Sequence, residues 1–264
     1  MHASPYRVHN HRPGSTPAFS LIELSIVLVI IGLLVGGILA GRSLIRASEI
    51  RGVTTEYERY RTALRAFEDK YFAVPGDMLN ATSFWGDNAS QCSDAGITDG
   101  DPGTCNGNGD GTVTGTGANS TTAEMYQFWN QLALAGMIEG SYTGISAPTN
   151  GSVIGLNSPR SKYPKAGWSA FTRNSGHTSF WAGARGNMFH YGAEAGTTLY
   201  GKAMPAEDVW KIDTKLDDGI SGMGKVVVVW WDDCTDAANN ADTDAEYLLS
   251  DASIQCAIMF LDVF

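Results

Sequence analysis

The stretch FSLIELSIVLVIIGLLVGGILAG, residues 19–41, decides how the rest of the chain is organised. Within it, the eighteen residues 24–41 include only one polar side chain, Ser25. At about 1.5 Å of rise per residue, a helix of this length reaches roughly 27 Å, close to the thickness of a bilayer's hydrocarbon core. We therefore expect one membrane-spanning helix. Glu23 lies at the edge of this run, where its carboxylate is costly to desolvate unless it meets a cationic partner.

Residues 19–24, Phe-Ser-Leu-Ile-Glu-Leu, follow a basic leader, and together they resemble the prepilin signature of type IV pilins and type II secretion pseudopilins. In those families a dedicated peptidase removes the leader and methylates the new amine. The resemblance implies a leader at residues 1–18, cleavage between Ala18 and Phe19, and N-methylation of Phe19. It also implies that Glu23 meets the N-terminal ammonium of a neighbouring subunit, an ion pair that would set subunit spacing in a filament. Gly32 matches the glycine usual inside this helix.

The chain departs from the family pattern at two positions. Ala18 precedes the expected cleavage site, where the family usually has glycine, and Ala40 stands where a proline is frequent. Any local unwinding of the helix would then depend on Gly36, Gly37 and Gly41, since each glycine costs a helix about 1 kcal/mol relative to alanine. The alternative interpretation is an ordinary signal anchor that contains a glutamate.

The leader carries two basic residues, Arg7 and Arg12, and no acidic one. By the positive-inside rule it stays in the cytoplasm and the C-terminus lies outside. The apolar run follows the expected cleavage site, so processing retains the helix and differs from ordinary signal-peptide removal. Processing would leave 246 of the 264 residues, enough for the helix and one sizeable head.

Charge is unevenly distributed along the chain. Residues 42–71 hold seven Lys or Arg and five acids, whereas residues 72–264 hold nine Lys or Arg and 22 acids, a formal net charge of −13. An extended nucleic-acid-binding face is therefore not expected, and cation binding or solubility is the better interpretation of the acidic head.

The membrane helix is expected to continue as an amphipathic helix over residues 42–74. Aromatic and apolar residues recur there at spacings of three and four, which places them on one helical face. Such a face packs on a core, and the resemblance implies that it lies against the protein's own head. Pro75-Gly76 is expected to end the helix. The members of the stripe are Val53, Tyr57, Tyr60, Leu64, Phe67 and Tyr71.

The head, residues 75–264, is expected to hold an antiparallel sheet, which gives an α+β, pilin-like fold. Residues 75–120 are predicted to form a long loop, and we assign no role to the segments 74–78 (VPGDM) and 212–219 (IDTKLDDG). Thr121 and Glu124 indicate a capping box at the start of a helix over residues 121–136. A second short helix is predicted over residues 205–219, and strands within residues 171–191, 226–231 and 254–264.

Two groups of side chains suggest calcium. Asn106, Asn108 and Asp110 alternate with glycines as in the opening of an EF-hand loop, although the twelfth position is Gly117 where a glutamate belongs. An Asn/Gly turn is the alternative. Asp213, Asp217 and Asp218 form the second group, and a solvated helix end is the alternative there.

Four cysteines lie beyond the membrane segment, where an even number suggests disulfides. Pairing Cys92 with Cys105 and Cys234 with Cys256 joins nearest neighbours, but it is one of three connectivities. Free thiols are a further alternative. Cys234 and Cys256 flank an acidic insert that resembles the disulfide-bounded loop of type IV pilins, a common site of surface contacts.

Catalytic motifs are missing from the sequence. It has no Gly-x-Ser-x-Gly elbow, phosphate loop or His-Glu-x-x-His motif, and His177 and His190 lack neighbours at metal-ligand spacing. Tryptophans could form a sugar-binding face, although core packing is the commoner role for them. They are Trp168, Trp181, Trp210, Trp230 and Trp231.

These observations predict a bacterial type IV pilin-like subunit, either a pilin or a pseudopilin, with no enzymatic activity. The resemblance implies as partners the prepilin peptidase, copies of itself and other pilins, and an inner-membrane assembly platform. It places the chain in the inner membrane with a single pass, and then in a pilus or pseudopilus in the periplasm or at the cell surface. No nucleic-acid partner is expected, no cofactor is required, and calcium is the one cofactor for which ligands are present.

The alternative is a membrane-anchored enzyme or calcium-dependent carbohydrate-binding protein that uses the helix only as a tether. A tether would tolerate Glu23→Ala, whereas a filament subunit should lose assembly.

Overall fold

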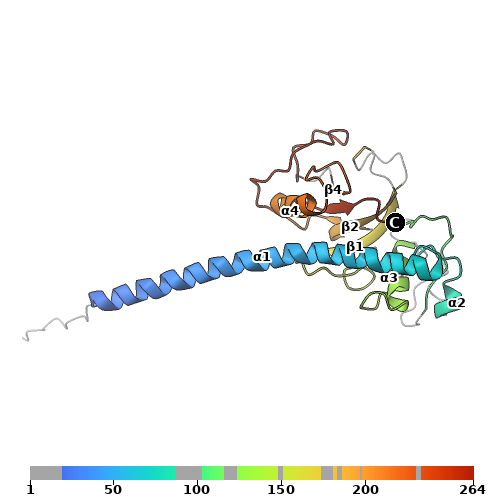
Figure 1. Ribbon diagram of the computed structural model, residues 1–264, viewed down its shortest axis with the longest axis horizontal. Helices are drawn as coiled ribbons and strands as arrows, with labels where there is room; N and C mark the ends of the chain where they lie inside the picture. The colour runs from blue at the N-terminus through green and yellow to red at the C-terminus, as the bar shows by residue number, and fades with distance from the viewer. Residues whose placement is uncertain are drawn as a thin grey trace, which may run out of the picture. The chain divides into compact units, whose positions relative to one another are not determined.

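The computed structural model describes residues 20–86, 103–115, 124–147, 151–173, 181–182, 186–196, 198–229 and 233–264 (Figure 1). The chain divides into two compact units, of which the first ends at Arg46 and the second begins at Ala47. The described part of the first unit is the N-terminal portion of helix α1, Leu21–Tyr71. In the described chain, this is the one helix long and apolar enough to cross a membrane.

Helix α1 ends at Tyr71, three residues before the boundary predicted at residue 74. Phe72 adopts a left-handed backbone conformation, with φ at 52°, and this conformation cannot continue the helix. A turn then follows in which the Asp77 N–H donates to the Val74 carbonyl. Pro75-Gly76 therefore located the turn correctly, but the backbone leaves helical geometry earlier, at Phe72.

The head contains a five-stranded antiparallel sheet. Strand β2 is central, because β1 and β5 flank it and β3 pairs with its C-terminal end, while β4 lies beyond β5. The strands are β1 (Gly167–Arg173), β2 (Gly186–Ala195), β3 (Thr198–Gly201), β4 (Val226–Val228) and β5 (Ile258–Phe260).

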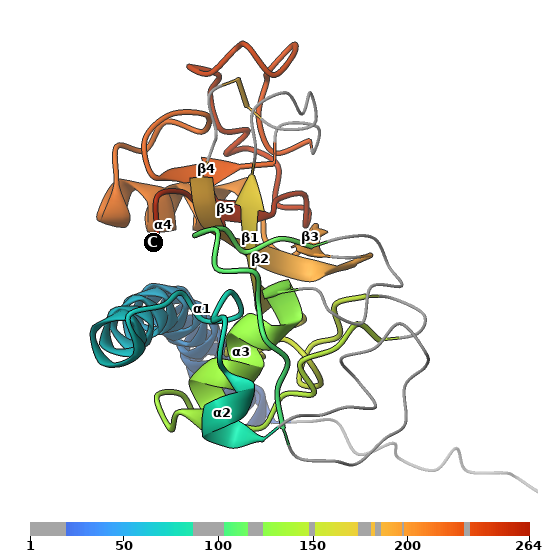
Figure 2. The same ribbon diagram turned by 90° about the vertical axis from the view of Figure 1, so that its right-hand side faces the viewer.

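One face of this sheet packs on two helices, the second half of α1 and α3 (Glu124–Leu134) (Figure 2). Tyr57 of α1 stacks on Phe260 with ring centroids 4.5 Å apart, and Tyr60 meets Trp168 edge-on. From α3, Trp129 contacts Phe189 of β2. Every member of the predicted aromatic stripe is buried or partly buried in this core, so the predicted α+β architecture is confirmed.

The remaining elements are shorter than the sequence predicts or were not predicted. Helix α4, Ala206–Leu216, lies within the predicted range, but the final strand is confined to three residues of the predicted 254–264. Cys256 pairs with Met204 before that strand, and Asp262 takes a left-handed conformation after it. The single-turn helix α2, Thr82–Trp85, was predicted as part of a long loop.

Candidate assembly and binding sites

Glu23 and Ser20 form a capping box at the start of α1. The Glu23 carboxylate accepts the Ser20 N–H at 2.9 Å, and the Ser20 hydroxyl accepts the Glu23 N–H at 3.3 Å. Each side chain thus satisfies a backbone donor that the first helical turn leaves free. The sequence carries the Ser-x-x-Glu signal of this cap, which our sequence interpretation missed. Ala18 and Phe19, the predicted processing residues, lie outside the described residues.

The glycines of the apolar segment have open surroundings within the described chain. A Cβ added to Gly32, Gly36, Gly37 or Gly41 would meet no atom within 4 Å, apart from the helix's own nearby backbone. No close contact inside this subunit therefore requires glycine there. The helix surface at these glycines is therefore accessible to lipid or to another helix.

The predicted calcium-binding oxygens of residues 106–110 accept hydrogen bonds from within the loop and from Thr82. Asn106 Oδ1 accepts the Thr82 N–H at 2.9 Å, and Asn108 Oδ1 accepts the Asp110 N–H at 2.9 Å. Asp110 Oδ1 accepts the N–H and the hydroxyl of Thr112, and these bonds lower the pKa of Asp110. The three side chains therefore shape the loop, and calcium binding here stays a prediction. Gly117 lies outside the described residues.

Asp77 anchors this loop, a role that the sequence did not indicate. Its buried carboxylate accepts the backbone N–H groups of Gly109 at 2.6 Å, Asp110 at 3.2 Å and Gly111 at 2.8 Å. Glu124 holds the same loop through the N–H groups of Asn108 at 3.1 Å and Thr114 at 2.9 Å. Two buried carboxylates are thus satisfied by backbone donors and fix residues 103–115 on the head. Thr121, the predicted capping partner of Glu124, lies outside the described residues.

Asp213, Asp217 and Asp218 do come together, with one carboxylate oxygen from each within 4.8 Å of the others. Asp213 is buried, which raises its pKa to about 7 even though the Tyr247 hydroxyl donates to it at 2.7 Å. Asp217 accepts the Val226 N–H, and exposed Asp218 accepts the Ile220 N–H. Oxygens this close could hold a hard cation, although each side chain also has a structural hydrogen bond.

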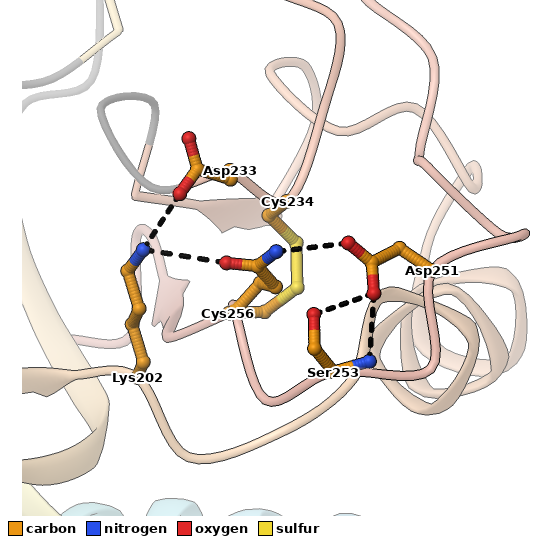
Figure 3. Close-up of polar contacts among 7 residues, drawn as sticks. Lys202, Asp233, Cys234, Asp251, Ser253 and Cys256 are labelled. Carbon is orange, nitrogen blue, oxygen red and sulfur yellow. Dashed lines mark hydrogen bonds and ion pairs between the residues drawn. A yellow bond between two sulfur atoms is a disulfide. The ribbon is translucent and has the colours of Figure 1, made fainter.

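Cys234 and Cys256 form the predicted disulfide, with Cα atoms 5.1 Å apart (Figure 3). Lys202, which directly follows β3, reinforces the base of the loop that they close. Its ammonium donates to Asp233 at 3.0 Å and to Gln255 at 3.4 Å, so it contacts the chain beside both cysteines. Figure 3 also shows Asp251 accepting the N–H of Ser253, which folds the chain before the second cysteine. The other predicted pair includes Cys92, which lies outside the described residues, whereas Cys105 is buried.

The tryptophans proposed for a sugar-binding face divide between the core and the surface. Trp168 and Trp181 are buried, and the Trp181 indole donates to the Val228 carbonyl at 2.6 Å. Trp210 is 37% exposed. Trp230, Trp231 and His177 lie outside the described residues. The tryptophans that the structure describes therefore do not form a row on the surface.

His190 is buried on the sheet face opposite Trp168. Burial lowers its pKa to about 3, and the nearby Arg173 adds to this effect. Its ring lies 5.8 Å from the Phe171 ring, which is consistent with a neutral core side chain.

No family model, curated protein or solved structure matches this chain. Any assignment of function therefore depends on the residues and their geometry.

Proposed function

We propose that this chain is a type IV pilin-like subunit, cleaved before Phe19, N-methylated and polymerised into a pilus or a type II secretion pseudopilus. The observation that carries the proposal is the construction of α1. Its N-terminal part exposes an apolar surface, whereas its C-terminal part contributes the aromatic stripe to the head's core. A single helix thus supplies a surface that needs lipid or other helices to cover it, and side chains on which the head depends.

The position of Glu23 supports the same function. Its carboxylate already accepts the Ser20 N–H, and cleavage before Phe19 would create an ammonium one residue from that group. In lipid, such a carboxylate is stabilised far more by an ammonium than by a peptide N–H alone. An ammonium from a neighbouring subunit would therefore favour packing of one helix beside another.

The decisive experiment is mass spectrometry of the mature N-terminus, with the full chain produced alongside an active prepilin peptidase. A chain that begins at methylated Phe19 supports the proposal, and Ala18→Gly should be processed at least as completely. An intact Met1, or cleavage at another bond, would contradict it. A peptidase-deficient strain provides the control.

The alternative function is a tethered calcium-dependent carbohydrate-binding protein or enzyme, and the carboxylate group at Asp213 favours its calcium part. Calorimetry with CaCl₂ on the full chain tests this alternative. Calcium binding that Asp217→Asn and Asp218→Asn abolish would support a metal site. Filament assembly that proceeds equally well in those variants and in chelator would show that the site is separate from assembly.

A further inference from the structure

A cavity of about 340 Å³ lies between the C-terminal end of α4 and the disulfide-bounded loop, residues 234–256. Trp210 and Ile220 line it from one side, and residues 244–247 and Leu249 line it from the other. The hydrogen bond from Tyr247 to Asp213 joins the two sides. The disulfide, the Lys202 contacts and this bond together keep the cavity walls in place before any ligand arrives.

The lining combines an aromatic surface with two carboxylates. Trp210 is 37% exposed, and Leu249 and Ile220 are also partly exposed. Asp244 and Glu246 are exposed, and their carboxylates have no hydrogen bond or ion pair to any residue that the structure describes. The side chains of Trp210, Ile220, Asp244, Glu246 and Leu249 are thus available to a ligand, whereas those of Ala245 and Tyr247 are buried.

The charge around the cavity favours a positively charged ligand. Asp217 and Asp218 lie on the α4 side, beside buried Asp213. Of the lysines of α4, Lys211 pairs with Glu207, whereas Lys215 donates to the neutral hydroxyl of Thr54 and keeps its charge. The four carboxylates of Asp217, Asp218, Asp244 and Glu246 outnumber the ammonium groups of Lys215 and Lys225, so a positively charged ligand would meet an excess of negative charge.

The shape and donors of the lining favour a guanidinium over a sugar. A sugar ring needs donors as well as acceptors, but the Tyr247 hydroxyl already donates to Asp213, which leaves the Trp210 indole as the remaining side-chain donor. A planar guanidinium stacks on an indole while its N–H groups reach carboxylates. We propose that this cavity binds an arginine side chain presented by a protein partner.

This proposal goes beyond filament assembly and does not depend on it, because every residue that it uses belongs to the head. Failure of leader processing would leave the cavity unchanged, and failure of arginine binding would leave the N-terminal experiment unaffected.

The test uses the full chain in detergent micelles, labelled with 5-fluorotryptophan and observed by ¹⁹F NMR. The Trp210→Phe variant assigns the Trp210 signal. The probe is the peptide acetyl-Gly-Arg-Gly-amide, and its neutral match replaces arginine with citrulline. We expect a saturable shift of the Trp210 signal with the arginine peptide, and at least about tenfold weaker binding of the citrulline peptide.

The double variant Asp244→Asn/Glu246→Gln should weaken arginine binding about tenfold, since it removes charge without changing shape. The matched control is Asp69→Asn/Glu139→Gln, which removes two exposed charges elsewhere in the second compact unit and should leave binding unchanged within about twofold. Equal binding of the two peptides, equal losses in the two double variants, or a shift caused by glucose instead of arginine would each overturn the proposal. So would a Trp210 signal that does not move at all.

Discussion

The carboxylate of Glu56 in α1 accepts a hydrogen bond of 2.9 Å from the indole N–H of Trp168 in β1, 112 residues further along the chain. The same carboxylate accepts the Lys162 N–H at 2.8 Å and is only 7% exposed. Two neutral donors therefore satisfy a buried charge, one from strand β1 and one from the segment that leads into it. This arrangement fixes the rotation of α1 against the head, because turning the helix by one residue, about 100°, would carry the carboxylate away from both donors.

Glu56→Ala should lower the free energy of unfolding by about 2–4 kcal/mol, because it leaves two buried N–H groups without an acceptor. Glu58→Ala is the matched control, since among the described residues that exposed side chain forms an ion pair only with Arg61, and it should cost about 0.5 kcal/mol or less. Urea unfolding of the full chain in detergent measures both. Similar losses in the two variants would mean that Glu56 does not hold the helix to the sheet.

Asp77→Ala should free the loop that its carboxylate anchors. Three backbone N–H groups lose their acceptor, so a loss of about 2–4 kcal/mol is expected, together with faster amide exchange at Gly109 and Gly111. Asp110→Ala removes the exposed turn bonds to Thr112 and should leave amide exchange at Gly109 and Gly111 closer to that of the unmodified chain. Hydrogen-exchange mass spectrometry distinguishes them, and unchanged exchange in Asp77→Ala would refute the anchoring role.

The charge and the capping role of Glu23 can be separated. Glu23→Gln keeps an oxygen able to accept the Ser20 N–H but removes the charge, whereas Ser20→Ala removes part of the cap and keeps the charge. If the charge drives assembly, Glu23→Gln should lose most filaments, and Ser20→Ala should keep them at a helix cost of about 1 kcal/mol. The measurement is the yield of sheared filaments relative to membrane-bound subunit. The opposite ranking would assign Glu23 to capping alone.

Removal of the disulfide should destabilise the head. Replacing Cys234 and Cys256 with serine frees a loop with a sequence separation of 22, worth about 3 kcal/mol in chain entropy. Thermal unfolding should show a lower Tm, and reductant should lower the Tm of the unmodified chain in the same direction. Lys202→Ala, which removes only the exposed polar contacts at the loop base, should change the free energy of unfolding by less than about 1 kcal/mol. A larger loss for Lys202→Ala than for the serine variant would contradict this order.

The buried His190 should make the head sensitive to acid. Its pKa is about 3 in the folded chain against an ordinary value of 6.5, so the unfolded chain binds the extra proton between these values. The contribution of His190 to the free energy of unfolding is therefore present in full above about pH 6.5 and falls as the pH drops toward 3. From about pH 7 to about pH 5 the unmodified chain should lose about 2 kcal/mol relative to His190→Phe. The difference between the two denaturation curves isolates this group from Asp213, whose raised pKa has the opposite effect, and a constant difference would refute the prediction.

Local patterns predicted the parts of this fold that depend on periodicity. The stripe from Val53 to Phe67 identified the buried face of α1, and the Pro205 and Gly219 boundaries located α4. The burial of Glu56 and Asp77 could not be predicted, because their donors come from distant segments and nothing nearby marks an acid as buried. The grouping of Asp213 with Asp217 follows from helical spacing, whereas the hydrogen bond from Tyr247 to Asp213 depends on how the disulfide-bounded loop folds back.

The pairing of β2 with β5 has a consequence for the order of events in the cell. Strand β5 occupies residues 258–260, almost the last of the chain, and its Phe260 also stacks on Tyr57 of the first helix. The central strand therefore lacks one neighbour, and Tyr57 of α1 lacks its stacking partner, until residues 258–260 have been synthesised. The head should complete its folding only after β5 has left the ribosome. If α1 spans the membrane as proposed, that step takes place on the far side, after the helix has inserted.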